Sequence, residues 1–142
     1  MLRISSASKL FMVITGVVFA GSVFVADIPK AQAEEQSTLA EGARLYDKWY
    51  KVIKADKPKV SHPAYPADKK YAKKPDANWR CKECHGWDAK GVNGGYASGK
   101  HNTGIKGIDG MKGAADAKIV AVLKDATHQY GDKMGAGDLA KV

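Results

Sequence analysis

Two cysteines separated by two residues and followed directly by a histidine constrain this chain more than any other feature. Residues 81–85 read Cys-Lys-Glu-Cys-His, and Cys81 and Cys84 are the only cysteines among 142 residues. A disulfide between them would close almost no loop and would stabilise the fold little. The spacing therefore indicates a chemical role for the pair.

Three kinds of site use two cysteines at this spacing. A thioredoxin-type redox pair needs an alternating strand–helix pattern, which the sequence lacks. A zinc site needs two further ligands at finger or knuckle spacing, and the other three histidines are not so placed. The third is covalent attachment of haem c, in which both thiols form thioethers to the vinyl groups and the next histidine binds the iron. We therefore predict one covalent haem c on Cys81 and Cys84, with His85 as the proximal iron ligand.

The first 33 residues have the composition of a secretory signal. Two positive charges, Arg3 and Lys9, precede an almost uncharged apolar run at residues 10–25. Ala-Gln-Ala at 31–33 then supplies the small-x-small pattern that signal cleavage requires. The run is shorter than the roughly 20 apolar residues of a comfortable membrane span. We expect cleavage after Ala33 and a periplasmic location; retention of the segment as an N-terminal anchor is the alternative.

The chain is basic, with 23 Lys and Arg against 15 Asp and Glu and a formal net charge of +8. Such an excess steers a protein toward acidic partners or anionic surfaces, although solubility explains it equally well. The export signal disfavours nucleic acid as a partner. Redox partner proteins, acidic ones included, and a membrane-bound dehydrogenase or reductase are the expected partners.

Residues 34–142 are expected to form one domain with few helices. Helical periodicity is present at 37–54, at 116–124 and from 136 onward, and no strand is convincing. The first helix is expected to begin at Ser37 or Thr38 as its cap. Its inward face is expected to hold Leu39, Ala43, Tyr46, Tyr50 and Ile53, broadened by Leu45, Trp49 and Val52. The last helix has room for about two turns, so we expect a truncated C-terminal helix.

Two long stretches lack any regular pattern. Residues 55–78 are rich in proline and lysine, and residues 86–113 are rich in glycine. Such long irregular loops are uncommon in a compact domain. A cofactor that fills the core in place of peptide would explain them.

The sequence resembles class I (mono-haem) cytochromes c. Residues 42–46, Gly-Ala-Arg-Leu-Tyr, resemble their first-helix pattern, and residues 119–142 are similar to their penultimate helix, distal-ligand loop and start of the last helix. The insertion at 55–78 and the run Trp-Arg-Cys-Lys-Glu-Cys-His-Gly-Trp at 79–87 resemble an exported bacterial subgroup. The resemblance implies an all-α, cytochrome c-like fold in which few helices and long loops wrap around one covalent haem.

The resemblance also bears on the sixth iron ligand. Laid on the family's pattern, His128 falls where the distal ligand lies, and Met134 falls at a structural leucine or isoleucine position. We favour His128, with Met134 as the alternative. A second imidazole lowers the reduction potential, whereas a thioether raises it. Ligation by His85 and His128 thus predicts a low-potential carrier.

The remaining histidines and two of the tryptophans are expected to have structural positions and not to bind the metal. His62 is expected to be exposed. His101 is expected at the surface or beside a haem propionate. Trp79 and Trp87 flank the motif and are expected to pack in the core, with contact to the haem edge as the alternative.

These features predict a periplasmic single-electron carrier of a respiratory chain rather than an enzyme. No cluster of catalytic type stands out, and a six-coordinate haem leaves no open position for substrate. The alternative is the haem subunit or catalytic haem domain of a periplasmic oxidoreductase, for example one acting on sulfur compounds. A haem-based sensor is disfavoured, because the chain has no room for a signalling domain.

Overall fold

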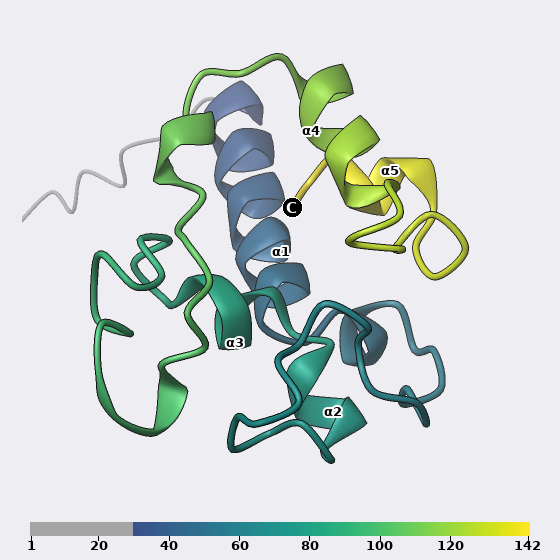
Figure 1. Cartoon of the computed structure of the whole chain (residues 1–142). Coiled ribbons are helices and arrows are strands. Elements are labelled where there is room, and N and C mark those ends of the chain that lie inside the picture. The colour runs from purple at the N-terminus through teal and green to yellow at the C-terminus, as the bar shows by residue number, and fades with distance from the viewer. Residues whose placement is uncertain (1–29) are drawn as a thin grey trace, which may run out of the picture.

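The computed structural model describes residues 30–142, and every regular element in this range is a helix (Figure 1). The α-helices are α1 (Lys30–Val52), α2 (Pro75–Asn78), α3 (Cys81–His85), α4 (Asp116–Leu123) and α5 (Ala136–Leu139), and short 3-10 turns occur at Gly99–His101 and Asp109–Met111. Within residues 30–142, β pairing is limited to one isolated bridge between Gly91 and Lys106. The prediction of an all-α fold is confirmed for this range. None of its helices is both long and apolar enough to cross a membrane.

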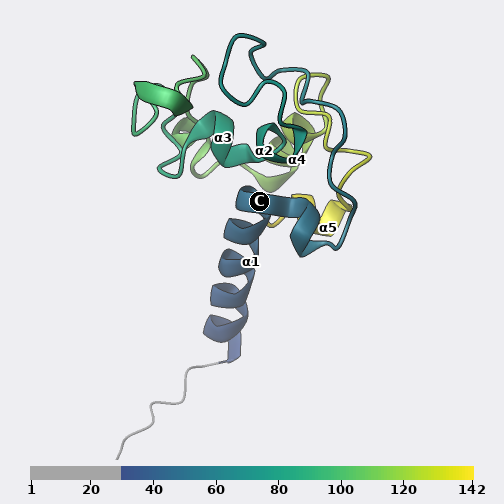
Figure 2. The same ribbon diagram turned by 90° about the horizontal axis from the view of Figure 1, so that it is seen from below.

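Helix α1 begins well before the expected start at Ser37. Ser37 and Thr38 are therefore interior residues, and the Thr38 hydroxyl donates to the Glu34 carbonyl at 3.0 Å instead of capping the helix. Residues 30–40 are exposed, and this part of α1 extends away from the other elements (Figure 2). The predicted signal, residues 1–33, lies outside the described residues except for the first turn of α1, and its cleavage stays a prediction.

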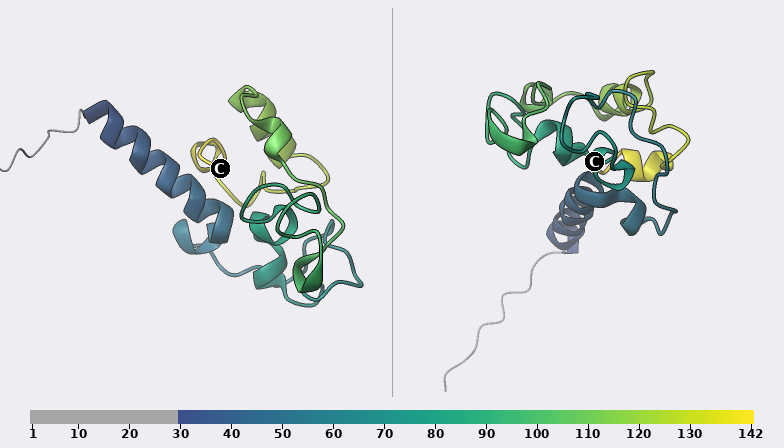
Figure 3. Two further views of the ribbon diagram at one scale, coloured as in Figure 1. Left: turned by 90° about the vertical axis from the view of Figure 1, so that its left-hand side faces the viewer. Right: turned by 60° about the horizontal axis from the view of Figure 1, so that its bottom comes forward.

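The C-terminal half of α1 carries its buried face. Its buried residues are Gly42, Leu45, Trp49 and Tyr50. Leu45, Trp49 and Tyr50 are buried as expected, whereas Leu39, also expected on the inward face, is 67% exposed. At Lys48 the dihedral angles (φ −156°, ψ 68°) are non-helical, and the last turn of α1 departs from the axis of the preceding turns (Figure 3). This break changes which residues face the core near the end of the helix.

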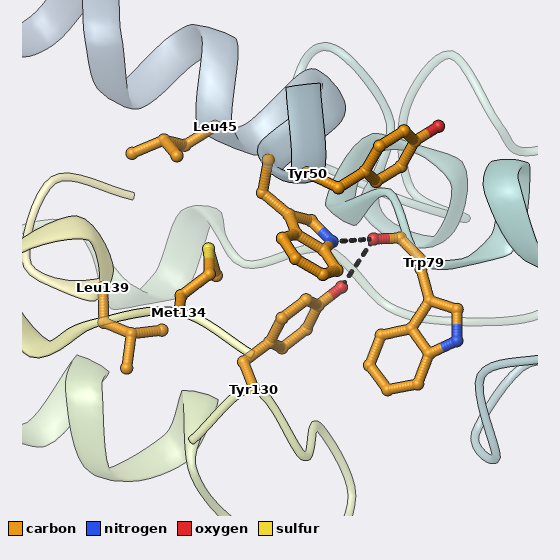
Figure 4. Close-up of a cluster of buried hydrophobic side chains, with 7 residues drawn as sticks. Leu45, Tyr50, Trp79, Tyr130, Met134 and Leu139 are labelled. Carbon is orange, nitrogen blue, oxygen red and sulfur yellow. Dashed lines mark hydrogen bonds between the residues drawn. The ribbon is translucent and has the colours of Figure 1, made fainter. Parts of the chain in front are cut away.

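The hydrophobic core joins α1 to Trp79, between α2 and α3, and to the last part of the chain (Figure 4). It consists of Leu45, Trp49, Tyr50, Trp79, Tyr130, Met134 and Leu139. The Trp49 indole N–H and the Tyr130 hydroxyl both donate to the Trp79 carbonyl, each at 2.9 Å. The Trp49 and Tyr130 rings meet edge to face with centroids 6.1 Å apart. Three distant parts of the chain are thereby fixed to one another.

The end of the chain crosses α1 at Gly42. A Cβ atom at Gly42 would collide with the Lys141 carbonyl, so only glycine permits this close approach. The Lys141 ammonium also lies 3.0 Å from the Glu41 carboxylate. The segment after α4 is thus pinned against α1, with α4 beside α5 (Figure 1).

The proline-rich segment 55–78 is irregular, as expected, until it enters α2. Its anchor is Asn78, which is 1% exposed. The Asn78 amide donates to the carbonyls of Tyr71 and Ala72 at 2.9 and 3.3 Å, and its oxygen accepts the backbone N–H of His62 at 2.9 Å. These bonds hold the segment beside α3.

Candidate functional site

Helix α3 directs the cysteine pair and the following histidine into one cavity. The chain enters this five-residue helix from an extended residue, Arg80, and leaves it at Gly86, whose φ of 79° favours glycine. Residues three apart in a helical turn lie on the same side of it. Accordingly Cys81, Cys84 and His85 all line the same cavity.

The charged residues between the cysteines do not line that cavity. The Lys82 ammonium lies 3.1 Å from the carboxylate of Glu83, which is only 4% exposed. Arg80 pairs with Asp47 of α1 and lies 3.6 Å from Glu83. Because a buried carboxylate requires compensating charge, these contacts satisfy Glu83 and hold α3 against α1.

The cavity has a volume of about 740 Å³, within the roughly 300–1,000 Å³ typical of small-molecule and cofactor sites. Its walls are mainly apolar. They include Ile105, Ile108 and Met111 of the glycine-rich region and Ile119, Val122 and Leu123 of α4. Helix α4 has no fully buried residue, and three of its apolar side chains line this space. Apolar surface left open in this way marks a binding site.

The two thiols are not activated. Desolvation by burial raises the pKa of Cys81 to about 11 and the pKa of Cys84 to about 12. The two cysteines are not joined by a disulfide. A redox-active or nucleophilic cysteine needs a lowered pKa. The environment therefore disfavours a thioredoxin-type pair.

The glycine-rich region orients the His85 ring. Nδ1 of His85 lies 2.9 Å from the Lys106 carbonyl oxygen, so Nδ1 carries the proton and donates it, and Nε2 keeps a free lone pair. Gly91 allows the segment that carries the Lys106 carbonyl to approach so closely. Its φ is 53°, and a Cβ atom at this position would collide with the Ile105 carbonyl. Burial lowers the pKa of His85, which favours the neutral ring that a metal requires.

His128 lies across the cavity, in the loop after α4. The Asp125 carboxylate accepts the backbone N–H groups of Thr127 and His128, each at 2.8 Å, and lies 3.1 Å from Nδ1 of His128. These hydrogen bonds lower the pKa of Asp125. As at His85, Nδ1 is engaged by an oxygen acceptor and Nε2 is the nitrogen that remains.

The spacing of the two histidines is suited to a shared metal. Their ring centroids are 6.4 Å apart, with an interplanar angle of 26°. Imidazole nitrogens bind metals at about 2.0–2.1 Å and lie about 1.1 Å from the ring centre, so two imidazoles on opposite sides of one metal have centroids about 6.3 Å apart. The centroid separation of the His85 and His128 rings matches this value.

Met134, the alternative sixth ligand, lies elsewhere. It is 4% exposed and packs in the core between Tyr130 and Leu139 (Figure 4). It does not line the cavity, whereas His128 does. Its sulfur has the packing role that is usual for a core methionine.

Two predictions about flanking residues are wrong. His62, expected to be exposed, is 7% exposed, and Trp87, expected in the core, is 62% exposed with the Lys82 ammonium 4.8 Å from its ring centre. Trp79 is buried as predicted, at 5%. His101 is partly buried, 3.2 Å from the Glu83 carboxylate.

Two residues near His128 were not predicted as part of the site. Asp125 stands three positions before His128, a spacing that could have signalled a carboxylate–histidine pair. The Nε2 atom of His62 lies 3.1 Å from the His128 carbonyl oxygen. Burial lowers the pKa of His62. No local pattern links His62 to a residue so distant in the sequence.

Across residues 30–142, no group of three or more His, Cys, Asp or Glu side chains converges on one point. A metal held in a macrocycle needs only axial ligands from the protein, so a pair of histidines suffices. Comparison of the chain with protein-family models, curated proteins and solved structures found no match.

Proposed function

We propose that this chain is a class I c-type cytochrome that carries single electrons outside the cytoplasm. It would hold one haem c through thioethers at Cys81 and Cys84. His85 and His128 are the proposed axial ligands of the iron.

The observation that carries the proposal is the 6.4 Å separation of the His85 and His128 rings across a cavity lined by both cysteines. Two further features support it. Each ring uses Nδ1 for an oxygen acceptor and keeps Nε2 for a metal. The apolar walls, which include side chains of α4, suit the faces of a flat macrocycle.

Haem supplies one-electron chemistry, and the residues of the chain tune it. The apolar side chains of α4 that line the cavity would give the haem a mainly apolar environment. The Asp125 carboxylate and the Lys106 carbonyl orient the two imidazoles and strengthen them as electron donors. Two histidine ligands, His85 and His128, would stabilise the oxidised metal and give the carrier a low reduction potential. With both of them bound, the iron would have no open position for substrate, which favours electron transfer over catalysis.

The proposed site of action is the periplasm, because the N-terminal sequence has the features of an export signal. Residues 34–142 hold 20 Lys and Arg against 14 Asp and Glu, and this basic excess favours acidic redox proteins as partners. A membrane-bound dehydrogenase or reductase would supply or accept the electrons.

The test is expression of the full chain together with a cytochrome c maturation system. We expect pigment that stays on the polypeptide after denaturation and acid–acetone extraction, and an oxidised low-spin spectrum without the near-infrared band of iron–methionine ligation. Pigment released on extraction, or protein without iron, overturns the proposal. Rapid cyanide binding would instead favour the catalytic haem domain of an oxidoreductase.

A further inference from the structure

A hydrogen bond connects the proline-rich segment 55–78 to the proposed distal ligand. Nε2 of His62 lies 3.1 Å from the backbone carbonyl oxygen of His128. The Nδ1 atom of His62 lies 3.2 Å from the backbone N–H of Ala64, which can only donate. Nδ1 is therefore the acceptor, Nε2 carries the proton, and His62 donates to His128.

His62 is itself held firmly. Its backbone N–H donates to the Asn78 side chain at 2.9 Å, and Asn78 is 1% exposed. Its ring packs against Trp79 with centroids 4.3 Å apart and faces Tyr130 at 5.9 Å. Asn78 and Trp79 lie three and two residues before Cys81, so His62 links the segment that holds the cysteines to the loop that holds His128.

The His128 loop has few other restraints from outside itself. The hydrogen bonds from the backbone of Thr127 and His128 to Asp125 are internal to the loop. Residues 124–127 are exposed. Tyr130 ties the end of the loop to the core through the Trp79 carbonyl. The His62 side chain, from the insertion, donates a hydrogen bond to the backbone carbonyl of His128 itself. Of the contacts to this loop, it is the one best placed to hold the His128 ring at its present distance from the His85 ring.

We infer that His62 is a positioning residue for His128, so that the insertion at 55–78 controls how readily the distal histidine leaves the metal. This inference rests on the proposed function. His62 would not touch the metal; it acts through the backbone of His128. Loss of its N–H frees the loop to move outward, which exposes the sixth position to outside ligands.

The experiment compares His62→Leu, His62→Gln and Ser61→Ala in the haem-loaded full chain. Leucine removes the donor, and glutamine offers an N–H at nearly the same place. Ser61→Ala is the matched control, because it removes one hydrogen bond within the same insertion, from the Ser61 hydroxyl to the Ala72 carbonyl at 2.6 Å. The readouts are the rate of cyanide binding to the oxidised protein, the high-spin fraction and the free energy of unfolding.

We expect cyanide to bind at least about tenfold faster in His62→Leu, in line with the roughly 10–100-fold effects of removing partners behind a metal ligand. His62→Gln should recover most of the difference, and Ser61→Ala should bind cyanide at the wild-type rate. Equal rates in His62→Leu and wild type overturn the inference. So does a rate in Ser61→Ala that matches His62→Leu at similar loss of stability.

A measurement on the wild-type protein covers the case in which His62→Leu does not fold. Nitrogen NMR of labelled histidine should show His62 as the neutral form protonated at Nε2, with a slowly exchanging proton. A proton on Nδ1 instead overturns the inference, because Nε2 could not donate. Absence of bound iron in wild type is a separate result that defeats the proposed function, whereas the His62 tautomer reports on this hydrogen bond alone.

Discussion

The two sides of the cavity are built in different ways. The attachment segment, residues 79–91, carries Cys81, Cys84 and His85 within one five-residue helix. The His128 segment, residues 119–134, carries one proposed metal ligand, and its loop contacts remote parts of the chain through His62 and Trp79. The first side is specified by local sequence and the second by the fold.

This difference has a physical origin. Within the attachment segment, short backbone bonds close each turn, such as Gly86 N–H to Lys82 at 2.9 Å and Gly91 N–H to His85 at 2.8 Å. The His128 segment also has a local device, the Asp125 carboxylate, but this fixes the shape of the loop and not its place. Tyr130 and Met134 in the core set that place. Changes to the attachment segment should therefore act on haem binding, and changes around the His128 segment on ligation and stability.

The largest effect is expected from removing both thiols of the attachment segment. In Cys81→Ala with Cys84→Ala, covalent attachment should be lost completely, because no other thiol exists in the chain. Haem staining of a denaturing gel measures this. Each single variant should keep one thioether and part of the stain. Full staining of the double variant would show that the attachment segment is not the site.

The next largest effect distinguishes the two candidates for the sixth iron ligand, His128 and Met134. His128→Ala should convert the oxidised protein from low to high spin and open it to carbon monoxide and cyanide. Met134→Leu should leave the spectrum unchanged and cost less than about 1.5 kcal/mol of stability, since leucine and methionine have similar volumes. Absorption spectra and denaturant unfolding report both. A spectrum altered by Met134→Leu and unaltered by His128→Ala would reverse the assignment.

The sequence predicts local features well. The starts of α4 and α5 agree with the expected 116 and 136, because apolar periodicity and short-range bonds determine them. The grouping of the cysteines with His85 also follows from spacing alone. The irregular character of 55–78 follows from its prolines, which cannot continue a helix.

Features set by long-range packing could not be predicted in the same way. The final residues of the chain meet α1 at Gly42, so Leu39, which lies before this contact, stays exposed. The sequence around His62, next to a proline, predicts an exposed side chain. In the structure His62 is buried, and its backbone N–H donates to the buried Asn78 side chain. Trp87 follows the left-handed Gly86, which turns the chain outward to solvent. Each case depends on a partner that periodicity does not reveal.

A smaller effect compares the two tryptophans that flank the motif. Trp79→Ala should lower the free energy of unfolding by about 3–5 kcal/mol, because it removes a buried side chain at the junction of both segments. Trp87→Ala should change it by no more than about 1 kcal/mol, the range of an exposed cation–π contact with Lys82. Chemical denaturation measures both. Equal losses would mean that the attachment segment packs on both of its sides.

The smallest effect concerns a local anchor on the attachment side. The Asp88 carboxylate accepts the backbone N–H groups of Gly95 and Lys90 at 2.7 and 3.2 Å, and these bonds hold the pKa of Asp88 below its ordinary value of 3.8. Since the folded pKa is lowered, the stabilisation is fully present above pH 3.8 and is lost as the pH falls through the lowered value.

In Asp88→Asn this pH dependence should vanish. The denaturation midpoint of wild type should exceed that of the variant at pH 6, and the two should converge as the pH falls below 3.8. Asp88 is exposed to solvent, so the difference should be small and salt-sensitive. A gap that persists unchanged at low pH would mean that the carboxylate charge is not what holds Gly95. In that case the glycine-rich region is fixed by its backbone contacts around Gly91 and Lys106, and the attachment side is less dependent on side-chain chemistry than its sequence suggests.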